Sequence, residues 1–187
     1  MNIAIIPARG GSKRIPRKNI KEFHNKPMIA YSIEAAKNSG CFDKVIVSTD
    51  DAEIAEVAIQ YGAEVPFIRP ENISDDFATT LDVMQHAIDW CQKQQWSIDK
   101  VCCIYATAPF ILPEFIQKGL AELSVDSVQY AFSATTFPFP IQRAITLSKS
   151  GLVSMLSPEH VNTRSQDLHE TYHDAGQFYW GRANDFL

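Results

Sequence analysis

The segment at residues 8–19, A-R-G-G-S-K-R-I-P-R-K-N, combines the residue types that bind phosphate groups. It holds two adjacent glycines, one serine and five cations. Glycine lets backbone amides approach a bound group closely, and cations and hydroxyls satisfy phosphate oxygens. The spacing matches neither the P-loop pattern G-x-x-x-x-G-K-[ST] nor the G-x-G-x-x-G turn of dinucleotide-binding folds. A solvated basic turn is the alternative, but the position directly after an apolar strand favours a phosphate site.

Charge is distributed unevenly along the chain. The formal net charge is −5, from 17 basic and 22 acidic residues. Residues 9–26 contain seven of the basic residues and one acidic residue. An acidic protein with one local cluster of cations is unsuited to general nucleic-acid binding, where a basic excess supplies most of the affinity. The pattern favours a small polyanion as the ligand.

The elements that would position this segment alternate between strands and helices. Short apolar runs predict strands at residues 2–7, 44–48, 64–68, 100–105 and 127–134. Apolar periodicity and end signals predict helices at residues 28–39, 79–94 and 113–123. A further helix is predicted between Asp50 and Gly62: Asp50 and Asp51 supply its N-cap, Glu53 follows three residues after Asp50, and Gly62 ends it. We therefore expect one α/β domain over residues 1–187, with a doubly wound, mainly parallel sheet. The loops after its first four strands should share one edge.

Other side chains give weaker signals. Asp75 and Asp76 could ligate a metal, but capping the helix that begins near Thr79 is the interpretation we favour. No pair of the three histidines at residues 160–173 has H-x-x-x-H spacing on a helix, so ordinary polar roles are expected. The four cysteines lack C-x-x-C spacing, which predicts buried, reduced thiols. With no secretory-signal pattern and no bilayer-length apolar run, we expect a cytoplasmic protein without a membrane partner.

Several motifs together resemble one enzyme family. They are I-P-A-R-G-G-S-K-R-I-P-R-K-N-I at residues 6–20, S-T-D-D at 48–51, R-P at 69–70 followed by S-D-D at 74–76, and Y-A-T-A-P at 105–109. They resemble the CMP-nonulosonic acid synthetases (acylneuraminate cytidylyltransferases), which make CMP-activated nine-carbon α-keto sugar acids. T-F-P-F-P-I-Q-R at 136–143 and Y-H-D-A-G-Q-F-Y-W-G at 172–181 resemble the pseudaminic acid branch. The resemblance covers essentially the whole chain and implies a Rossmann-like fold of the nucleotide-diphospho-sugar transferase type.

The resemblance implies that CTP binds along this edge of the sheet. The sugar's anomeric hydroxyl would attack the α-phosphorus, releasing pyrophosphate, with Arg9 and Lys18 stabilising the charge that develops. Arg69 and Thr79 match family positions near the cytosine and ribose. An ion pair of Arg69 with Glu71 or Asp75 is the alternative reading of that arginine. The remaining CTP contacts implied by the resemblance come from Ala8, Arg9, Gly10, Gly11, Ser12, Lys13, Lys18 and Asn19.

The acceptor is an acid, and bidentate geometry favours arginine as the partner of its carboxylate. Arg164 with Gln166 matches the family's sugar-acid region, while Arg143 with Gln142 and the side chain of His173 are further candidates. In this family a dimer partner completes that part of the site. Residues 136–175 are therefore expected to form a dimerisation arm of a homodimer. Within them, F-P-F-P at 137–140 cannot lie in a central strand, because proline removes ladder donors.

The family's reaction implies Mg²⁺, which bridges phosphates and withdraws charge from the α-phosphorus. The expected carboxylate ligands, an I-D-x-D-T-E-like strand, do not occur in residues 1–187. We therefore expect these ligands beyond Leu187, in a C-terminal piece absent from this sequence. The alternatives left open are an N-acetylneuraminate or legionaminate cytidylyltransferase, a catalytically silent CTP-binding module, and a nucleotidyltransferase that uses UTP or GTP.

Overall fold

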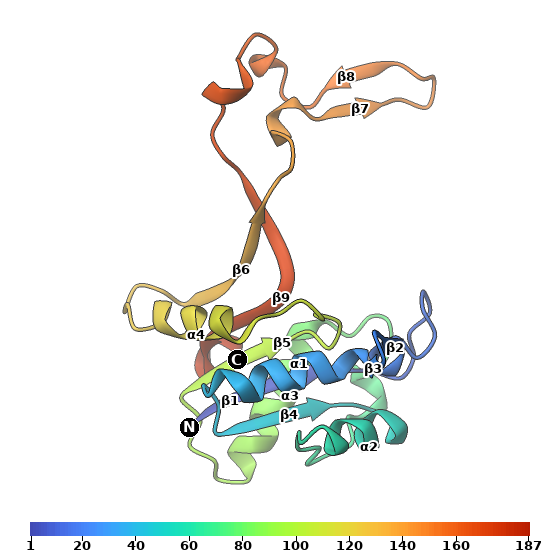
Figure 1. Ribbon diagram of the computed structural model, residues 1–187, viewed down its shortest axis with the longest axis vertical. Coiled ribbons are helices and arrows are strands. Elements are labelled where there is room, and N and C mark those ends of the chain that lie inside the picture. The colour runs from blue at the N-terminus through green and yellow to red at the C-terminus, as the bar shows by residue number, and fades with distance from the viewer. The chain divides into compact units, whose positions relative to one another are not determined.

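A computed structural model describes residues 1–187, which group into two compact units (Figure 1). The first unit comprises Met1–Ser133 and Gly176–Leu187, and the second comprises Ala134–Ala175. No helix in either unit has the length and apolar character needed to cross a bilayer.

A five-stranded sheet has the order β4-β1-β5-β9-β6. These strands are Lys44–Ser48, Asn2–Pro7, Lys100–Ile104, Tyr172–Arg182 and Tyr130–Thr136 respectively. β1 pairs in parallel with both β4 and β5, and β9 runs antiparallel to β5. β1 lies at the centre of the parallel part, which explains its continuous apolar run. The expectation of a mainly parallel α/β sheet is confirmed.

Four α-helices cover the two faces of this sheet. They are α1 (Met28–Ser39), α2 (Ala52–Gln60), α3 (Thr80–Lys93) and α4 (Pro113–Glu122). Buried side chains of α1, α2 and α4 join one core cluster, and those of α3 join a second. Alternate residues of β1 pack into the two clusters: Ala4 and Ile6 belong to the first, and Ile3 and Ile5 belong to the second. Each fully buried isoleucine stabilises the fold by about 1.5–3 kcal/mol.

The cysteines follow the same alternation. Cys102 and Cys103 point to opposite clusters, and Cys91 is also buried. Burial raises the pKa of the Cys91 thiol to about 11 and that of Cys103 to about 12. These three thiols are therefore held neutral by burial, as predicted, whereas Cys41, a free thiol as well, is only half-buried.

Two predicted strands differ from the structure. The prediction of a strand at residues 64–68 is wrong, because this segment makes only two isolated bridges, Glu64 with Ile46 and Ile68 with Thr49. Pro66 lies between them and has no N–H to continue the ladder. The strand expected at 127–134 begins later, at Tyr130.

Short elements complete the fold. A small hairpin of β2 (Glu22–Phe23) and β3 (Lys26–Pro27) turns through His24 and Asn25, which both have positive φ. The 3₁₀ helices are Lys18–Ile20, Glu71–Ile73, Ile141–Arg143, Pro158–His160, Ser165–Asp167 and Ala183–Phe186.

The second unit has no core of its own. It contains a hairpin of β7 (Ile145–Leu147) and β8 (Val153–Met155), and none of its residues is buried. Residues 137–140 lie outside every strand, as the two prolines predicted. Large apolar side chains of this unit face solvent, with Ile145, Leu147, Leu152 and Val153 between 61% and 72% exposed.

Candidate active site

A cleft of about 460 Å³ lies at the carboxyl ends of β1 and β5. Its walls come from three segments: the loop after β1, residues 69–80, and residues 105–107 after β5. The expected convergence of loops at one edge of the sheet is therefore seen. The cleft brings together a subset of the sequence-predicted residues, namely Arg9, Ser12, Lys13, Lys18, Asn19, Arg69 and Thr79. Ala8, Gly10 and Gly11 belong to the same loop but do not line the cleft.

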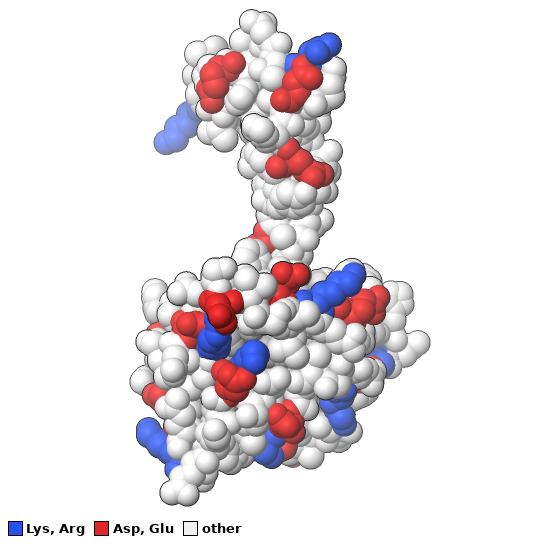
Figure 2. Space-filling model, turned by 90° about the vertical axis from the view of Figure 1, so that its left-hand side faces the viewer, with Lys and Arg blue, Asp and Glu red and all other residues white.

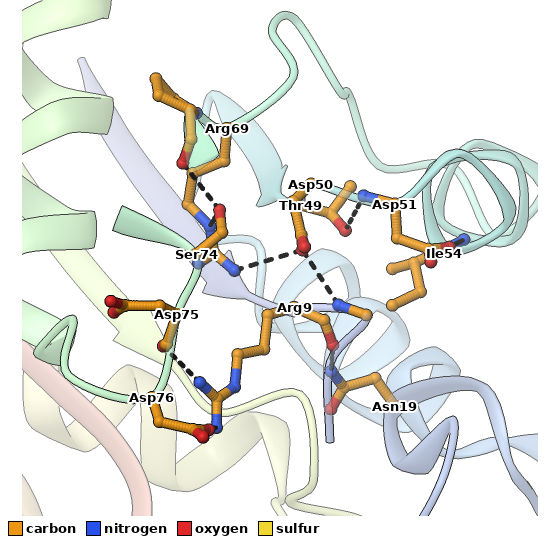
Figure 3. Close-up of polar contacts among 12 residues, drawn as sticks. Arg9, Asn19, Thr49, Asp50, Asp51, Ile54, Arg69, Ser74, Asp75 and Asp76 are labelled. Carbon is orange, nitrogen blue, oxygen red and sulfur yellow. Dashed lines mark hydrogen bonds and ion pairs between the residues drawn. The ribbon is translucent and has the colours of Figure 1, made fainter. Parts of the chain in front are cut away.

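Hydrogen bonds fix the start of the loop. Asn19 Nδ2 donates to the carbonyl oxygen of Arg9 at 2.9 Å, and this bond closes the loop on itself (Figure 3). The backbone N–H of Gly10 donates to Asp50 Oδ1 at 2.9 Å. A Cβ on Gly10 would lie 2.6 Å from Asp51 Oδ2, so only glycine fits there without a shift of that carboxylate. Gly10 is therefore required for packing, which the sequence interpretation had not considered.

Cations and carboxylates face each other across the cleft. Arg9 Nη2 pairs with Asp76 Oδ1 at 2.7 Å, and Arg9 Nη1 donates to the carbonyl oxygen of Asp75 (Figure 3). Lys13 also pairs with Asp76. Hydrogen bonds from Lys13 and then from Arg9 hold the pKa of Asp76 below its usual value. Mixed charge is also typical of the wider surface, where Figure 2 shows basic side chains beside acidic ones.

The predicted capping role of Asp75 and Asp76 is wrong. Thr79 caps α3: its Oγ1 accepts from the Asp82 backbone N–H at 3.2 Å, and its own N–H donates to Asp82 Oδ2 at 2.7 Å. Asp75 Oδ1 instead accepts from the backbone N–H groups of Phe77 and Ala78. Thr79 and Asp82 form the complete capping box, so neither carboxylate before Thr79 is needed for the cap.

Arg69 is buried at the inner wall of the cleft, with 4% of its surface exposed. Its Nε donates to Ser74 Oγ at 3.2 Å, and its Nη2 lies 3.6 Å from Asp50 Oδ1. The alternative pairing of Arg69 with Glu71 or Asp75 is therefore wrong. Desolvation lowers the pKa of Arg69, with the nearby Asp50 opposing it. Because Nη2 has no hydrogen-bond partner in the protein, the guanidinium retains a donor for a bound group.

Asp50 and Asp51, which the sequence predicted together as the N-cap of α2, have different roles in the structure. Asp51 caps α2, accepting from the Ile54 backbone N–H at 3.0 Å. Asp50 instead lies beside Arg69 (Figure 3), and its Oδ1 also accepts from the Gly10 backbone N–H. The predicted N-cap is therefore confirmed for Asp51 and wrong for Asp50, and the Glu53 carboxylate accepts from Arg17.

The residues predicted to bind a sugar acid all lie in the second unit. Gln142 Nε2 donates to the carbonyl oxygen of His169 at 3.0 Å, and Arg143 Nη2 donates to that of Thr163. Arg164 pairs with Asp167 at 2.8 Å and its side chain is 74% exposed. Gln166 is exposed, and the His173 ring packs edge-on against Phe137.

The described residues do not build a metal centre of their own. No three side chains of His, Cys, Asp or Glu come together as potential metal ligands. Asp76 is committed to two cations and Asp75 to two backbone N–H groups. These residues therefore do not fit a protein-built Mg²⁺ site.

Sequence reasoning missed other walls of the cleft. Arg14, Ile73, Thr80, Val83, Tyr105 and Thr107 also line it. The Y-A-T-A-P motif after β5 was the available signal for Tyr105 and Thr107. A separate apolar pocket of about 300 Å³ shares Thr80 and Tyr105 with the cleft and is otherwise lined by Leu81, Met84, Cys103, Tyr130, Tyr179 and Phe186.

Comparison with known proteins identifies the family of the chain. The cytidylyltransferase family model matches residues 3–184. The chain belongs to the cytidylyltransferase family. This cytidylyltransferase is 50% identical to a pseudaminic acid cytidylyltransferase of Campylobacter jejuni, over 100% of this chain and 80% of the relative. It is 40% identical to a Helicobacter pylori protein named as both pseudaminic acid cytidylyltransferase and a UDP-sugar hydrolase, over 98% of this chain and 35% of the relative.

Solved structures share the fold of this cytidylyltransferase. A CMP:2-keto-3-deoxy-manno-octonic acid synthetase complexed with CTP matches with a TM-score of 0.71 and 19% identity, over 99% of this chain and 75% of that chain. A 4-diphosphocytidyl-2C-methyl-D-erythritol synthase from Anaerococcus prevotii matches with a TM-score of 0.61 and 13% identity, over 98% of this chain and 71% of that chain. The family and the fold expected from the motifs are confirmed.

Proposed function

We propose that this cytidylyltransferase transfers CMP from CTP to the anomeric hydroxyl of a nine-carbon α-keto sugar acid, pseudaminic acid, and releases pyrophosphate. The observation that carries this proposal is the 50% identity to a pseudaminic acid cytidylyltransferase along the whole chain. A CMP-N,N'-diacetyllegionaminic acid synthase is 46% identical over only 63% of the chain, which ranks legionaminic acid second.

The cleft supplies what the nucleotide half of this reaction requires. Besides Arg69, four cations line it, and all four belong to the loop after β1: Arg9, Lys13, Arg14 and Lys18. The triphosphate would lie against these cations and the side chains of Ser12 and Asn19. Arg9 and Lys13 would then exchange the carboxylate of Asp76 for phosphate oxygens. Arg69, which has a spare buried donor, and Thr79 would lie by the ribose and cytosine.

The proposed chemistry is a direct displacement at phosphorus. A bond forms between the anomeric oxygen and the α-phosphorus, and the bond from that phosphorus to the oxygen bridging to the β-phosphate breaks. The hydroxyl proton is lost to solvent or a base, and pyrophosphate leaves with the electron pair. Arg9 and Lys18 would act by stabilising charge on the reacting phosphates, while the loop as a whole holds the groups in line.

We further propose that the protein acts as a homodimer, with residues 136–175 as the dimerisation arm. The absence of any buried residue between Ala134 and Ala175, with its exposed apolar side chains, supports this proposal. The sugar-acid carboxylate would meet the exposed guanidinium of Arg164, which would exchange its bond to Asp167 for the substrate, with Gln166, Gln142, Arg143 and His173 as additional contacts.

Two accessory proposals follow from the reaction. Mg²⁺ would accompany the triphosphate, since this ion is usually held by substrate phosphates with only one or two carboxylates. A cytoplasmic location fits four cysteines that are all free thiols.

The experiment is a pyrophosphate-release assay with CTP, Mg²⁺ and a panel of nonulosonic acids. We expect the highest kcat/KM with pseudaminic acid, and much lower rates with UTP in place of CTP. The variants Arg9→Ala and Lys18→Ala should each lose rate. Equal rates with UTP and CTP would contradict CTP as the specific nucleotide substrate. A higher kcat/KM with legionaminic or N-acetylneuraminic acid would make that acid, instead of pseudaminic acid, the acceptor.

A further inference from the structure

Arg17 differs from the other cations of its loop in where its guanidinium lies. Of the five cations in residues 8–19, Arg17 alone does not line the cleft. Its Nη2 donates to Asp51 Oδ1 at 2.9 Å, and its Nη1 donates to the second oxygen of the same carboxylate. Nη2 also donates to Glu53. Two carboxylates therefore hold this side chain by a fork of hydrogen bonds, a geometry that arginine makes and lysine cannot.

The backbone at Arg17 is itself unusual. Its φ of 54° and ψ of 29° place it in the left-handed region, which costs energy for any residue other than glycine. Such a conformation persists where surrounding contacts impose it. The carbonyl oxygen of Arg17 accepts from the Ile20 backbone N–H at 3.1 Å, and the guanidinium adds its bonds to Asp51 and Glu53. No other side chain caps the 3₁₀ helix that begins at the next residue, so the ion pairs of Arg17 are the side-chain contacts that hold the turn.

The turn determines where the next two side chains point. Lys18 and Asn19 follow it directly, open the 3₁₀ helix Lys18–Ile20 and line the cleft. Asn19 is 6% exposed and bonds the carbonyl oxygen of Arg9 at 2.9 Å. Any relaxation at Arg17 would thus move one cation out of the cleft and loosen the bond that closes the loop.

The anchor on the other side is rigid. Asp51 is the N-cap of α2 and accepts from the Ile54 backbone N–H at 3.0 Å (Figure 3). The hydrogen bond from Arg17 is the main reason why the pKa of Asp51 lies below its usual value. The carboxylate is therefore charged and fixed at the start of a helix, where it can serve as a fixed point for the loop.

We propose that Arg17 is a positioning residue for the nucleotide. Its ion pair with Asp51 holds the left-handed turn that directs Lys18 and Asn19 into the cleft, and in this way sets the affinity for the triphosphate. The inference rests on the proposed function in one respect, that the cleft binds CTP.

The test is CTP binding, measured by titration calorimetry on the whole protein and three variants. Arg17→Ala should raise the Kd for CTP about fivefold to tenfold, the effect of losing one well-formed ion pair. Arg17→Lys should raise it nearly as much, because an ammonium keeps the charge but not the fork. Asp51→Ser keeps an N-cap for α2 but removes the partner of Arg17, and should also raise the Kd.

The sign of the Asp51→Ser effect separates positioning from direct contact. If Arg17 bound the phosphates itself, removing a neighbouring negative charge would tighten CTP binding. If Arg17 acts through Asp51, the double variant Arg17→Ala/Asp51→Ser should bind no more weakly than the weaker single variant, because both remove one interaction.

The matched control is Lys26→Ala, which breaks the part-buried pair of Lys26 with Glu34 outside the cleft. It should leave the Kd unchanged, and thermal unfolding of every variant reports whether the fold is retained. An unchanged Kd for CTP in Arg17→Ala, or tighter CTP binding in Asp51→Ser, overturns the positioning role of Arg17. In that case the proposed function still stands as long as the unaltered protein binds CTP. If the unaltered protein does not bind CTP, the proposed function fails and the inference fails with it.

Discussion

Replacing Gly10 by alanine should disturb the protein far more than the added methyl group suggests. The new Cβ would lie 2.6 Å from Asp51 Oδ2 and 3.0 Å from Asp51 Cβ, inside van der Waals contact. Asp51 cannot simply move away, because it caps α2 and pairs with Arg17. Overpacking of this kind costs about 1–3 kcal/mol in the free energy of unfolding. For a protein of this size, each 1 kcal/mol lowers the Tm by about 2–4 °C.

Gly11→Ala is the matched control for Gly10→Ala. A Cβ on Gly11 meets nothing within 4 Å, and neither glycine has a positive φ. Gly11→Ala should therefore be neutral or stabilise by at most about 1 kcal/mol, through the unfolded chain. Urea unfolding followed by tryptophan fluorescence gives the stability of each variant, and CTP titration gives the effect on the loop. Equal stability and equal CTP affinity in the two variants would refute the packing argument.

Three further predictions concern the core, acid stability and the acceptor. Gly119→Ala places a Cβ 2.8 Å from atoms of both Phe178 and Trp180. Urea denaturation should show a free energy of unfolding lower by about 1–3 kcal/mol. An unchanged urea midpoint would show that the two rings can shift to accommodate the methyl group. The folded-state pKa of Asp51 lies below its ordinary value of 3.8, so its contribution to stability is present above pH 3.8 and is lost as the pH falls through the lowered folded-state pKa. In acid unfolding monitored by circular dichroism, Asp51→Ser should lose less stability than the unaltered protein as the pH falls below 3.8. Parallel curves for the two proteins would contradict the stabilising role of the Asp51 carboxylate. Arg164→Ala should raise the KM for the sugar acid about tenfold and leave the Kd for CTP unchanged, whereas an unaltered KM would leave the carboxylate without this partner.

The sequence predicted the regular elements well where a physical signal marked both ends. Gly40 closes α1 in the left-handed conformation that glycine adopts easily, and an apolar run of five or six residues marked each parallel strand. At residues 64–68 the apolar character was present, but Pro66 interrupts the ladder and a strand does not form. A proline inside a short apolar run should have counted against the strand.

The candidate site shows where sequence reasoning stops. Composition and position identified the loop after β1, yet five cations in a loop have no periodicity that tells which way each one points. The folded loop separates Lys18, which lines the cleft, from Arg17, which pairs with Asp51. The cap of α3 is a different case, because three candidate residues compete within five positions. There the T-x-x-D spacing of Thr79 and Asp82 was a readable signal that favoured threonine over the preceding aspartates.

The coreless second unit has a consequence for handling the protein. A stretch between Ala134 and Ala175 that buries no residue cannot hold a single conformation by its own packing. If a second copy supplies the missing contacts, order in this stretch follows mass action and increases with protein concentration. Limited proteolysis should then cut within it quickly in dilute solution and slowly in concentrated solution, while cleavage of the first unit stays the same.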